Sequence, residues 1–128
     1  MATRTELTLR LPNSPGALAD LCATLTEARI RLLGLELETN GTLRIIVDNP
    51  VRAVGTLRGK RHVVAEREVL VAAISNAPGS LAMVLRLVRD AGVNIEYAYA
   101  AASTESSSTA VAVLGVDDAL RAGAAAGL

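Results

Sequence analysis

The sequence is poor in the side chains on which most catalytic, metal and nucleic-acid sites depend. Its 128 residues include no Trp, no Phe, two Tyr, one Cys and one His. The single Cys22 excludes a disulfide within the chain and any multi-cysteine metal site. The 13 basic and 13 acidic side chains give zero formal net charge, so the chain lacks the overall positive field that attracts nucleic acid or an anionic membrane. We therefore expect neither of these partners.

Long hydrophobic runs and targeting signals are also missing. Charged residues interrupt every apolar stretch before it reaches the roughly 18 residues of a membrane span. The segment from Met1 to Glu6 lacks the basic start, apolar run and small-residue cleavage site of a signal peptide. Hydrophobic residues, mostly Ala, Leu, Val and Ile, still make up 51% of the chain. This composition predicts a packed cytoplasmic protein rather than a disordered one.

What the sequence does contain is an internal repeat. A seven-residue segment recurs 63 positions later with five identities, as Asn13-Ser14-Pro15-Gly16-Ala17-Leu18-Ala19 and then Asn76-Ala77-Pro78-Gly79-Ser80-Leu81-Ala82. The apolar positions stay in register for a further dozen residues after the repeated segment. Such self-similarity over this length predicts two copies of one structural unit.

The hydrophobic periods define the elements of the first copy. Two-residue alternation predicts a strand over residues 5–11, and apolar residues at helical spacing predict a helix over 18–28. Asn40-Gly41 between alternating segments 33–37 and 43–47 predicts a tight antiparallel hairpin with positive φ at both turn residues. Asp48-Asn49-Pro50 predicts the capped start of a short helix that ends at Gly59. Residues 62–68 form the fourth predicted strand.

The second copy repeats this order but stops early. Its predicted elements are a strand at 69–74, a helix at 80–91, a strand at 94–102, a loop at 103–108, a strand at 109–115 and a helix from Asp117 or Asp118. The segment after this helix is short and rich in glycine, so we expect the second copy to lack its last strand. The sheet edge left open in this way would need a partner.

The order β-α-β-β-α-β predicts an α+β fold of two tandem ferredoxin-like modules, each with helices on one face of an antiparallel sheet. We place the modules at residues 1–68 and 69–128. No linker separates them, because residues 63–74 form one extended run. Units of about 60 residues bury too little surface to be robust alone. We therefore expect the two modules to share a core or a continuous sheet.

The repeated Asn-x-Pro-Gly turn is the candidate binding element. Backbone N–H groups at the start of the following helix carry the positive end of the helix dipole and attract a carboxylate or phosphate. The Asn side chain offers a carbonyl that can accept from a ligand ammonium group. A zwitterionic amino acid would satisfy both. A tight strand-to-helix connection with no ligand requires the same residues, however, and turn chemistry alone favours that explanation.

Both copies resemble the ACT domain, a small βαββαβ module that commonly senses amino acids and regulates metabolic enzymes. The resemblance rests on the repeated Asn-x-Pro-Gly turns and on Asp90-Ala91-Gly92-Val93-Asn94-Ile95 in the second copy. It covers nearly the whole chain as two tandem modules with no attached enzyme domain. It implies a regulatory protein that binds an amino acid where paired modules meet. Because catalytic motifs are missing and a sheet edge is left open, we expect a non-catalytic homo-oligomer, a dimer. A cofactor is not implied.

The resemblance also implies which residues contact the ligand. They lie in the two turns and at the start of strand two of the second copy: Asn13, Ser14, Pro15, Gly16, Ala17, Leu18, Asn76, Ala77, Pro78, Gly79, Ser80, Leu81, Asn94 and Ile95. The first copy has Arg29-Ile30-Arg31-Leu32 in place of Gly92-Val93-Asn94-Ile95. Because it lacks the second asparagine, its site is either altered in specificity or empty.

Nucleic-acid binding and catalysis agree less well with the sequence. The RNA-recognition module shares the same element order, but its central strands carry base-stacking aromatics that are missing here. The basic cluster of Arg52, Arg58, Lys60, Arg61 and His62 is more typical of a solvated surface. Neither Cys22 nor His62 belongs to a catalytic or metal motif.

Two further interpretations stay open. Tyr97 and Tyr99 fall on one face of a strand, where they either pack in the core or an interface or cover a ligand side chain. The alternative to amino-acid sensing is a ligand-free scaffold or regulatory subunit that docks on a metabolic enzyme.

Overall fold

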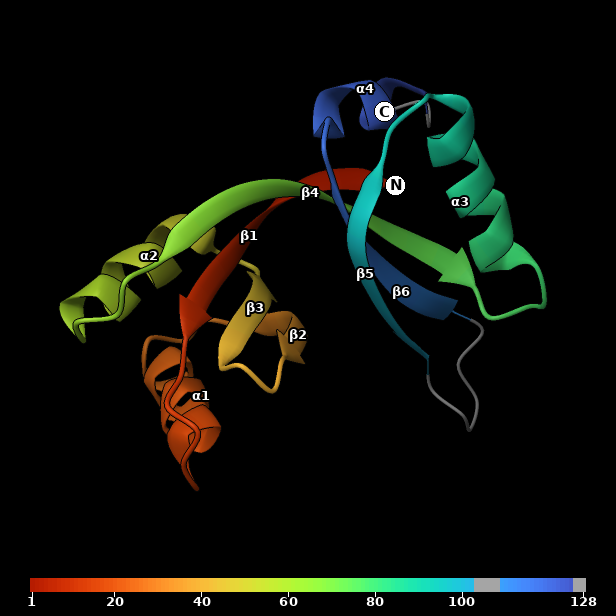
Figure 1. Ribbon diagram of the computed structural model, residues 1–128. Coiled ribbons are helices and arrows are strands. Elements are labelled where there is room, and N and C mark those ends of the chain that lie inside the picture. Colours follow the sequence, from red (N-terminus) through yellow and green to blue (C-terminus); the bar gives the residue numbers. More distant parts are fainter. Residues whose placement is uncertain (103–108, 126–128) are drawn as a thin grey trace. The chain divides into compact units, whose positions relative to one another are not determined.

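The architecture comes from a computed structural model that describes residues 1–102 and 109–125. The predicted loop at 103–108 and the tail at 126–128 lie outside the described residues. Figure 1 shows the elements in chain order: β1 (Ala2–Arg10), α1 (Ala17–Glu27), β2 (Leu32–Leu37), β3 (Thr42–Val47), α2 (Pro50–Gly59), β4 (Ala65–Ser75), α3 (Ser80–Asp90), β5 (Ile95–Ala102), β6 (Thr109–Val116) and α4 (Ala119–Ala125). The repeated β-α-β-β-α order predicted from the sequence is confirmed, and so is the extended run, which forms β4.

The strands follow the order β2-β3-β1-β4-β6-β5. Neighbours are antiparallel in the β1–β3, β2–β3, β4–β6 and β5–β6 pairs. This is the strand arrangement expected for tandem ferredoxin-like modules. Strand two of each module, β2 or β5, lies at an end of the order and therefore at a sheet edge.

The chain divides into two compact units. The N-terminal unit is Thr5–Arg67, and the C-terminal unit combines Met1–Arg4 with Glu68–Leu128. Residues 2–4, the first residues of β1, thus belong to the C-terminal unit. They lie on the side of β4 that the fourth strand of the second ferredoxin-like module would occupy. We expected an open edge there, and that expectation is wrong: β4 has β1 on one side and β6 on the other.

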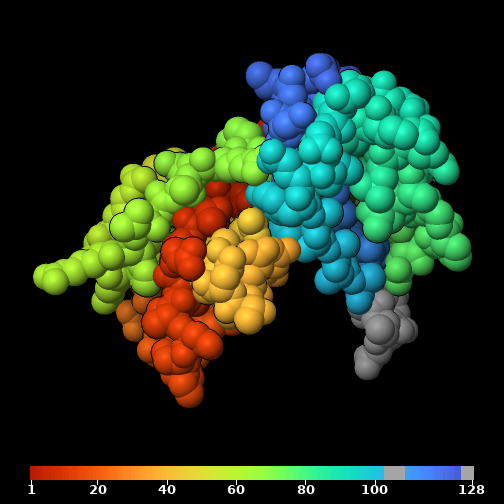
Figure 2. Space-filling view, in the orientation of Figure 1, coloured from red at the N-terminus to blue at the C-terminus, as the bar shows by residue number. Residues whose placement is uncertain are grey.

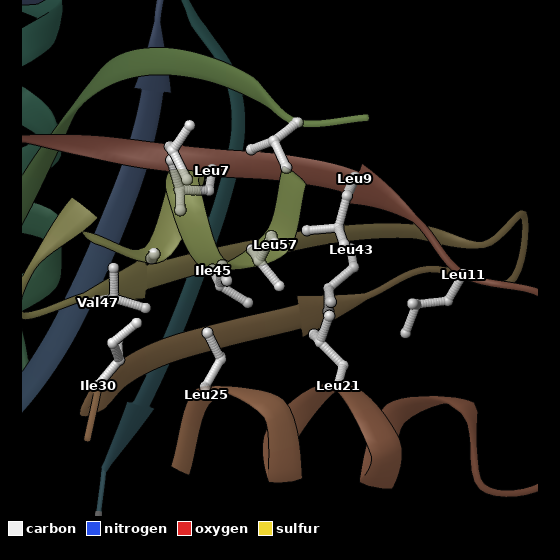
Figure 3. Close-up of a cluster of buried hydrophobic side chains, with 13 residues drawn as sticks. Leu7, Leu9, Leu11, Leu21, Leu25, Ile30, Leu43, Ile45, Val47 and Leu57 are labelled. Carbon is white, nitrogen blue, oxygen red and sulfur yellow. The ribbon is translucent and has the colours of Figure 1, made fainter. Parts of the chain in front are cut away.

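The N-terminal unit is held together by a dense aliphatic core. Figure 3 shows leucines of β1 and α1 pointing toward Leu43 and Ile45 of β3, with Leu57 of α2 closing the cluster. Leu7, Leu43, Ile45 and Leu57 are completely buried. At roughly 1.5–3 kcal/mol per fully buried aliphatic side chain, this cluster is the main stabilising feature of the unit. It also fixes the position of the turn between β1 and α1.

The β2–β3 hairpin differs in detail from the sequence expectation. Gly41 has φ +90°, but Asn40 is not among the residues with positive φ. The Gly41 N–H donates to the Glu38 carbonyl at 2.9 Å, which closes a four-residue turn, and the Glu38 N–H donates to the Thr42 carbonyl at 2.9 Å. This is a turn followed by one left-handed residue rather than a two-residue Asn-Gly turn. A Cβ on Gly41 would lie 2.6 Å from the Leu11 carbonyl oxygen, so this position requires glycine.

The C-terminal unit has a smaller core. α3 fully buries only Val88, whereas α1 buries both Leu21 and Leu25. The helix-side positions of β5 carry alanines such as Ala98 and Ala100, which pair with Leu114 and Ala112. These side chains are small, and several apolar residues of α3 are exposed. In Figure 2 α3 forms part of the surface of its unit.

Candidate functional site

The turn between β1 and α1 presents an uncapped helix start. Gly16 precedes the helix with φ +86°, and no side chain among the described residues caps α1. The Ala17 N–H donates to the Ser14 carbonyl at 3.3 Å, and the Gly16 carbonyl accepts from Asp20 at 2.9 Å. The next N–H groups, of Leu18 and Ala19, point out of the helix start. They carry the partial positive charge of the helix dipole and are suited to an anion.

The turn between β4 and α3 repeats this geometry. Gly79 has φ +88°, and again no side chain caps the helix. The Ser80 N–H donates to the Ala77 carbonyl at 3.2 Å, and the Gly79 carbonyl accepts from Met83 at 3.0 Å. A Cβ on Gly16 or Gly79 would meet no atom within 4 Å. Glycine is therefore selected by the left-handed backbone and not by crowding.

The first turn borders a hollow of about 390 Å³ within the N-terminal unit. Five of the six predicted residues of this turn line it: Asn13, Ser14, Gly16, Ala17 and Leu18. Pro15 does not.

The opposite wall of this hollow comes from the β2–β3 hairpin, through Leu37, Glu38, Thr39 and Gly41. Sequence reasoning missed these residues. The hairpin is held there because the Leu11 N–H donates to the Gly41 carbonyl at 2.8 Å. These residues could have been predicted from the length of the hairpin together with the antiparallel pairing of β1 with β3. Glu38 adds a carboxylate, which also pairs with Arg44 at 3.0 Å.

The second turn borders a smaller hollow of about 220 Å³, lined by Asn76, Ala77 and Leu81 of the predicted set. The rest of its wall comes from β5, β6 and the end of β4: Ile74, Ser75, Ala100, Ala101, Ala102 and Ala110. Pro78, Gly79 and Ser80 are not among the lining residues. The hydroxyl of Ser80 instead lies 2.6 Å from that of Ser75.

Asn94 and Ile95 are not near the second turn within their unit. They follow the end of α3, whereas Asn76 precedes its start, and an 11-residue helix is about 16 Å long. The backbone of Asn94 is held by Asp117, which accepts the Asn94 N–H on its carboxylate at 3.0 Å and returns its own N–H to the Asn94 carbonyl at 3.2 Å. One unit therefore cannot bring Asn76 and Asn94 to the same ligand.

The same carboxylate clamp is present in the first copy. The Arg31 N–H donates to Asp48 at 2.9 Å, and the Asp48 N–H donates to the Arg31 carbonyl at 3.0 Å. The helix cap predicted at Asp48-Asn49-Pro50 belongs to Asn49 alone, whose side chain accepts from Arg52 at 3.1 Å. The clamp explains why strand two starts at the same place in both copies although its residues differ.

The first hollow has the size and charges for a zwitterion. Ligand sites typically occupy about 300–1,000 Å³, so the hollow at Asn13 is large enough and the one at Asn76 is smaller than usual. Helix N–H groups suit a carboxylate, and Glu38 or the Asn13 carbonyl suits an ammonium group. Side chains of the described residues leave both hollows open.

Cys22 and His62, the single cysteine and histidine of the sequence, lie in different segments of the N-terminal unit. Residues 1–102 and 109–125 contain no group of three His, Cys, Asp or Glu side chains able to hold a metal ion. Cys22 is half-buried and lines a hollow with Arg29 and Arg31. The half-buried His62 lies in the connection between α2 and β4. None of the described helices is both long and apolar enough to cross a membrane.

Known proteins share this architecture. A family model described as an ACT domain pair matches residues 2–123. A solved structure of a Bacteroides thetaiotaomicron protein is 28% identical with a TM-score of 0.85, covering 96% of this chain and 85% of that one. The regulatory subunit of aspartate kinase from Thermus flavus is 18% identical with a TM-score of 0.66, covering 97% and 92%. Its Thermus thermophilus counterpart, in a ligand-free form, is 17% identical with a TM-score of 0.67, covering 98% and 93%. No curated protein sequence matches the chain.

Proposed function

Because this chain belongs to the ACT domain pair family, we propose that it is a non-catalytic regulatory protein that binds a free amino acid. The ligand carboxylate is bound by the N–H groups at the start of α1, and the ammonium group by the Asn13 carbonyl or by Glu38. The observation that carries this proposal is an uncapped, glycine-led helix start that opens into a 390 Å³ hollow. The second turn, with its hollow of about 220 Å³, is the corresponding site for a small amino acid.

Regulation follows from the position of the edge strands. β2 and β5 lie at the ends of the strand order, where strands of another chain can add to the sheet. Addition of a second copy would place its strand two beside a first-turn site and supply the contacts of Asn94 and Ile95 that one unit cannot. A ligand that touches both copies favours the assembled dimer over the separate chains.

The partner in this proposal is an enzyme of amino-acid metabolism. The fold similarity to aspartate kinase regulatory subunits supports a regulatory chain that acts on a separate catalytic protein. The second candidate is a scaffold of the same fold that docks on an enzyme without a ligand. Saturable binding of one amino acid distinguishes the two candidates.

The experiment is a thermal-shift panel of the twenty amino acids, followed by calorimetry of each hit with the full chain. We expect Asn13→Ala to weaken a ligand of the first site by about three- to tenfold, since it removes one hydrogen bond. Ala19→Asp adds a carboxylate to the wall of the hollow and should abolish binding by repelling the ligand carboxylate. Ala23→Asp, on an exposed position of the same helix outside the hollow, is the matched control.

The second site and the assembly are tested in parallel. Asn76→Ala and Asn94→Ala should each weaken a ligand of the second site, and sedimentation should show more dimer with ligand than without. A hit that survives Asn13→Ala, Ala19→Asp, Asn76→Ala and Asn94→Ala would show that neither turn binds the ligand. If no amino acid binds and the chain still dimerises, the scaffold interpretation replaces the sensor.

A further inference from the structure

A second hollow in the N-terminal unit collects cationic side chains from two distant segments of the chain. It measures about 540 Å³ and is lined by Thr8, Leu9, Arg10, Thr42, Arg61, His62, Val63 and Ala65. We name it the cationic hollow. It shares no lining residue with the hollow at Asn13 or the hollow at Asn76. Its chemistry is therefore separate from that of the amino-acid sites.

The sheet places three of its polar side chains on one face. Thr8 and Arg10 alternate with Leu7 and Leu9 of the core, so they point to the face opposite the helices. Thr42 is the antiparallel partner of Arg10 in β3, and such partners have Cβ atoms about 4.5–5.5 Å apart. The Arg10 guanidinium donates one hydrogen bond, of 2.7 Å, to the Asn40 carbonyl. This contact orients the guanidinium and leaves its other N–H groups for a ligand.

The connection from α2 to β4 supplies Arg61 and His62. Arg61 follows the helix with φ +69°, a left-handed conformation that is unfavourable for a residue with a side chain. The Arg61 N–H donates to Arg58 at 2.9 Å, and the His62 N–H donates to Leu57 at 3.0 Å, which ends the helix. The Arg58 guanidinium holds the Val64 carbonyl at 3.1 Å. These bonds fix the backbone of the connection, and Arg61 and His62 line the hollow together with Arg10 of β1.

Glycine would suit the backbone at Arg61 better. Another helix end, the turn after α3, has Gly92 at its left-handed position, with φ +70°. An arginine in this conformation is retained at some cost in stability, and such positions are enriched at functional sites. A cation at a helix C-terminus also interacts favourably with the helix dipole, which is the purely structural explanation. That explanation does not account for Arg10, which belongs to β1.

The charges of the cationic hollow are not balanced. No carboxylate lines it, and among the described residues no ion pair is formed by Arg10 or Arg61. Arg44, on the same sheet face, contrasts with them because it pairs with Glu36 at 2.8 Å and with Glu38 at 3.0 Å. Two guanidinium groups, an imidazole and two hydroxyl groups therefore face one cavity without a counter-charge. This donor set matches an anion with several oxygens.

We propose that the cationic hollow binds the phosphoryl group of a small metabolite. Arginine forks and hydroxyl groups recognise phosphate oxygens, and the hollow has the volume of a small-molecule site. Nucleic acid is disfavoured, because the chain has zero net charge and no aromatic residue lines the hollow. The protein then reads two signals, an amino acid at its turns and a phosphorylated compound at this second site.

The test is calorimetry of the full chain with inorganic phosphate and with pyrophosphate at constant ionic strength, and citrate serves as the carboxylate competitor. We expect saturable binding at millimolar concentration or below, tighter for pyrophosphate than for citrate. Arg61→Gly should weaken pyrophosphate binding by about tenfold or more, since it removes a charged donor. The same variant should have an unchanged or higher melting temperature without ligand, because glycine accepts the left-handed backbone.

Arg29→Gly is the matched control. It makes the same change at the end of α1, where Arg29 has φ +58°, but Arg29 does not line the cationic hollow. Pyrophosphate binding should be unchanged in this variant. The proposal is overturned if wild-type chain binds neither phosphate nor pyrophosphate, if citrate binds more tightly than pyrophosphate, or if Arg29→Gly weakens binding as much as Arg61→Gly. Each result is independent of whether an amino acid binds at Asn13.

Discussion

The ring of Tyr97 on edge strand β5 lies directly over Gly115, its cross-strand partner in β6. A Cβ built on Gly115 would lie 2.2 Å from the Tyr97 Cζ atom and 2.4 Å from Cε1. The ring therefore occupies the space in which a side chain of residue 115 would stand. An aromatic residue that covers a glycine in this way restores the packing that glycine cannot supply to a sheet. The pair anchors β5, which has a neighbour on one side only.

Gly115→Ala should destabilise the chain, because the new methyl group overlaps a ring rather than the end of a flexible side chain. We expect the free energy of unfolding to fall by about 1–3 kcal/mol, the usual cost of overpacking. Urea unfolding followed by circular dichroism measures this. Combining Gly115→Ala with Tyr97→Ala should remove most of the penalty that Gly115→Ala causes alone, since the overlapping ring is gone.

Gly55→Ala is the matched control for that substitution. Gly55 lies inside α2, and a Cβ there would meet no atom within 4 Å. Alanine is the better helix former by about 0.5–1 kcal/mol, so this variant should be more stable than wild type. A loss of stability in Gly55→Ala equal to that in Gly115→Ala would show that the ring overlap is not the cause.

Hydrophobic period and internal repetition were sufficient to predict the order of the elements. Strand residues such as Leu7 and Leu9 alternate without interruption, and the helix face of Leu21 and Leu25 is equally regular, so packing agrees with local pattern. The shared face of Tyr97 and Tyr99 was predicted for the same reason and is confirmed by their partners Gly115 and Val113. Hydrophobic periodicity does not indicate which distant segment completes a sheet.

Most of the features that the sequence did not predict depend on contacts between distant segments of the chain. Residues 2–4 occupy the place of the last strand of the C-terminal unit, although nothing in their sequence distinguishes them from the rest of β1. Glu38 lines the Asn13 hollow because of the geometry of the β2–β3 hairpin. Arg10 and Arg61 line one hollow because of the conformation of the α2–β4 connection, which the sequence did not predict. The left-handed backbone of Arg29 and Arg61 could not be predicted either, because glycine is the residue expected in this conformation.

The two copies use different residues at the left-handed position that ends their first helix. Arg29 has φ +58° and Gly92, 63 residues later, has φ +70°. Arg29→Gly should raise the free energy of unfolding by up to about 1 kcal/mol, which is the relief of strain less the greater flexibility of glycine in the unfolded chain. Gly92→Ala should lower it by about 1–2 kcal/mol. Urea unfolding of both variants gives the signs, and equal signs would contradict the prediction.

Asp48 and Asp117 should contribute equally to stability, because each clamps the first residues of a strand two through paired hydrogen bonds. Asp48→Ala and Asp117→Ala should each lower the free energy of unfolding by about 1 kcal/mol, as expected for an exposed hydrogen bond to a charged group. Asp48→Asn keeps an acceptor oxygen and should cost less. Glu66→Ala, on an exposed strand position, should change stability by less than about 0.5 kcal/mol. An unchanged midpoint for Asp48→Ala would refute the clamp.

The start of β1 should stabilise the C-terminal unit rather than the N-terminal one. Met1 packs against the cluster of Leu70, Val88 and Leu114, and residues 2–4 belong to that same unit. Replacing Ala2, Thr3 and Arg4 by Gly, Pro and Gly removes a ladder donor and disfavours the extended backbone.

Amide hydrogen exchange reports this effect strand by strand. In that triple variant we expect the β4 and β6 amides to lose about 1–3 kcal/mol of protection, because the neighbour of β4 is lost. The β3 amides, which pair with residues 6–10 of β1, should keep their protection. Equal loss in β3 and β6 would instead show that the two units unfold as one, and no loss in either would show that residues 2–4 do not complete the sheet.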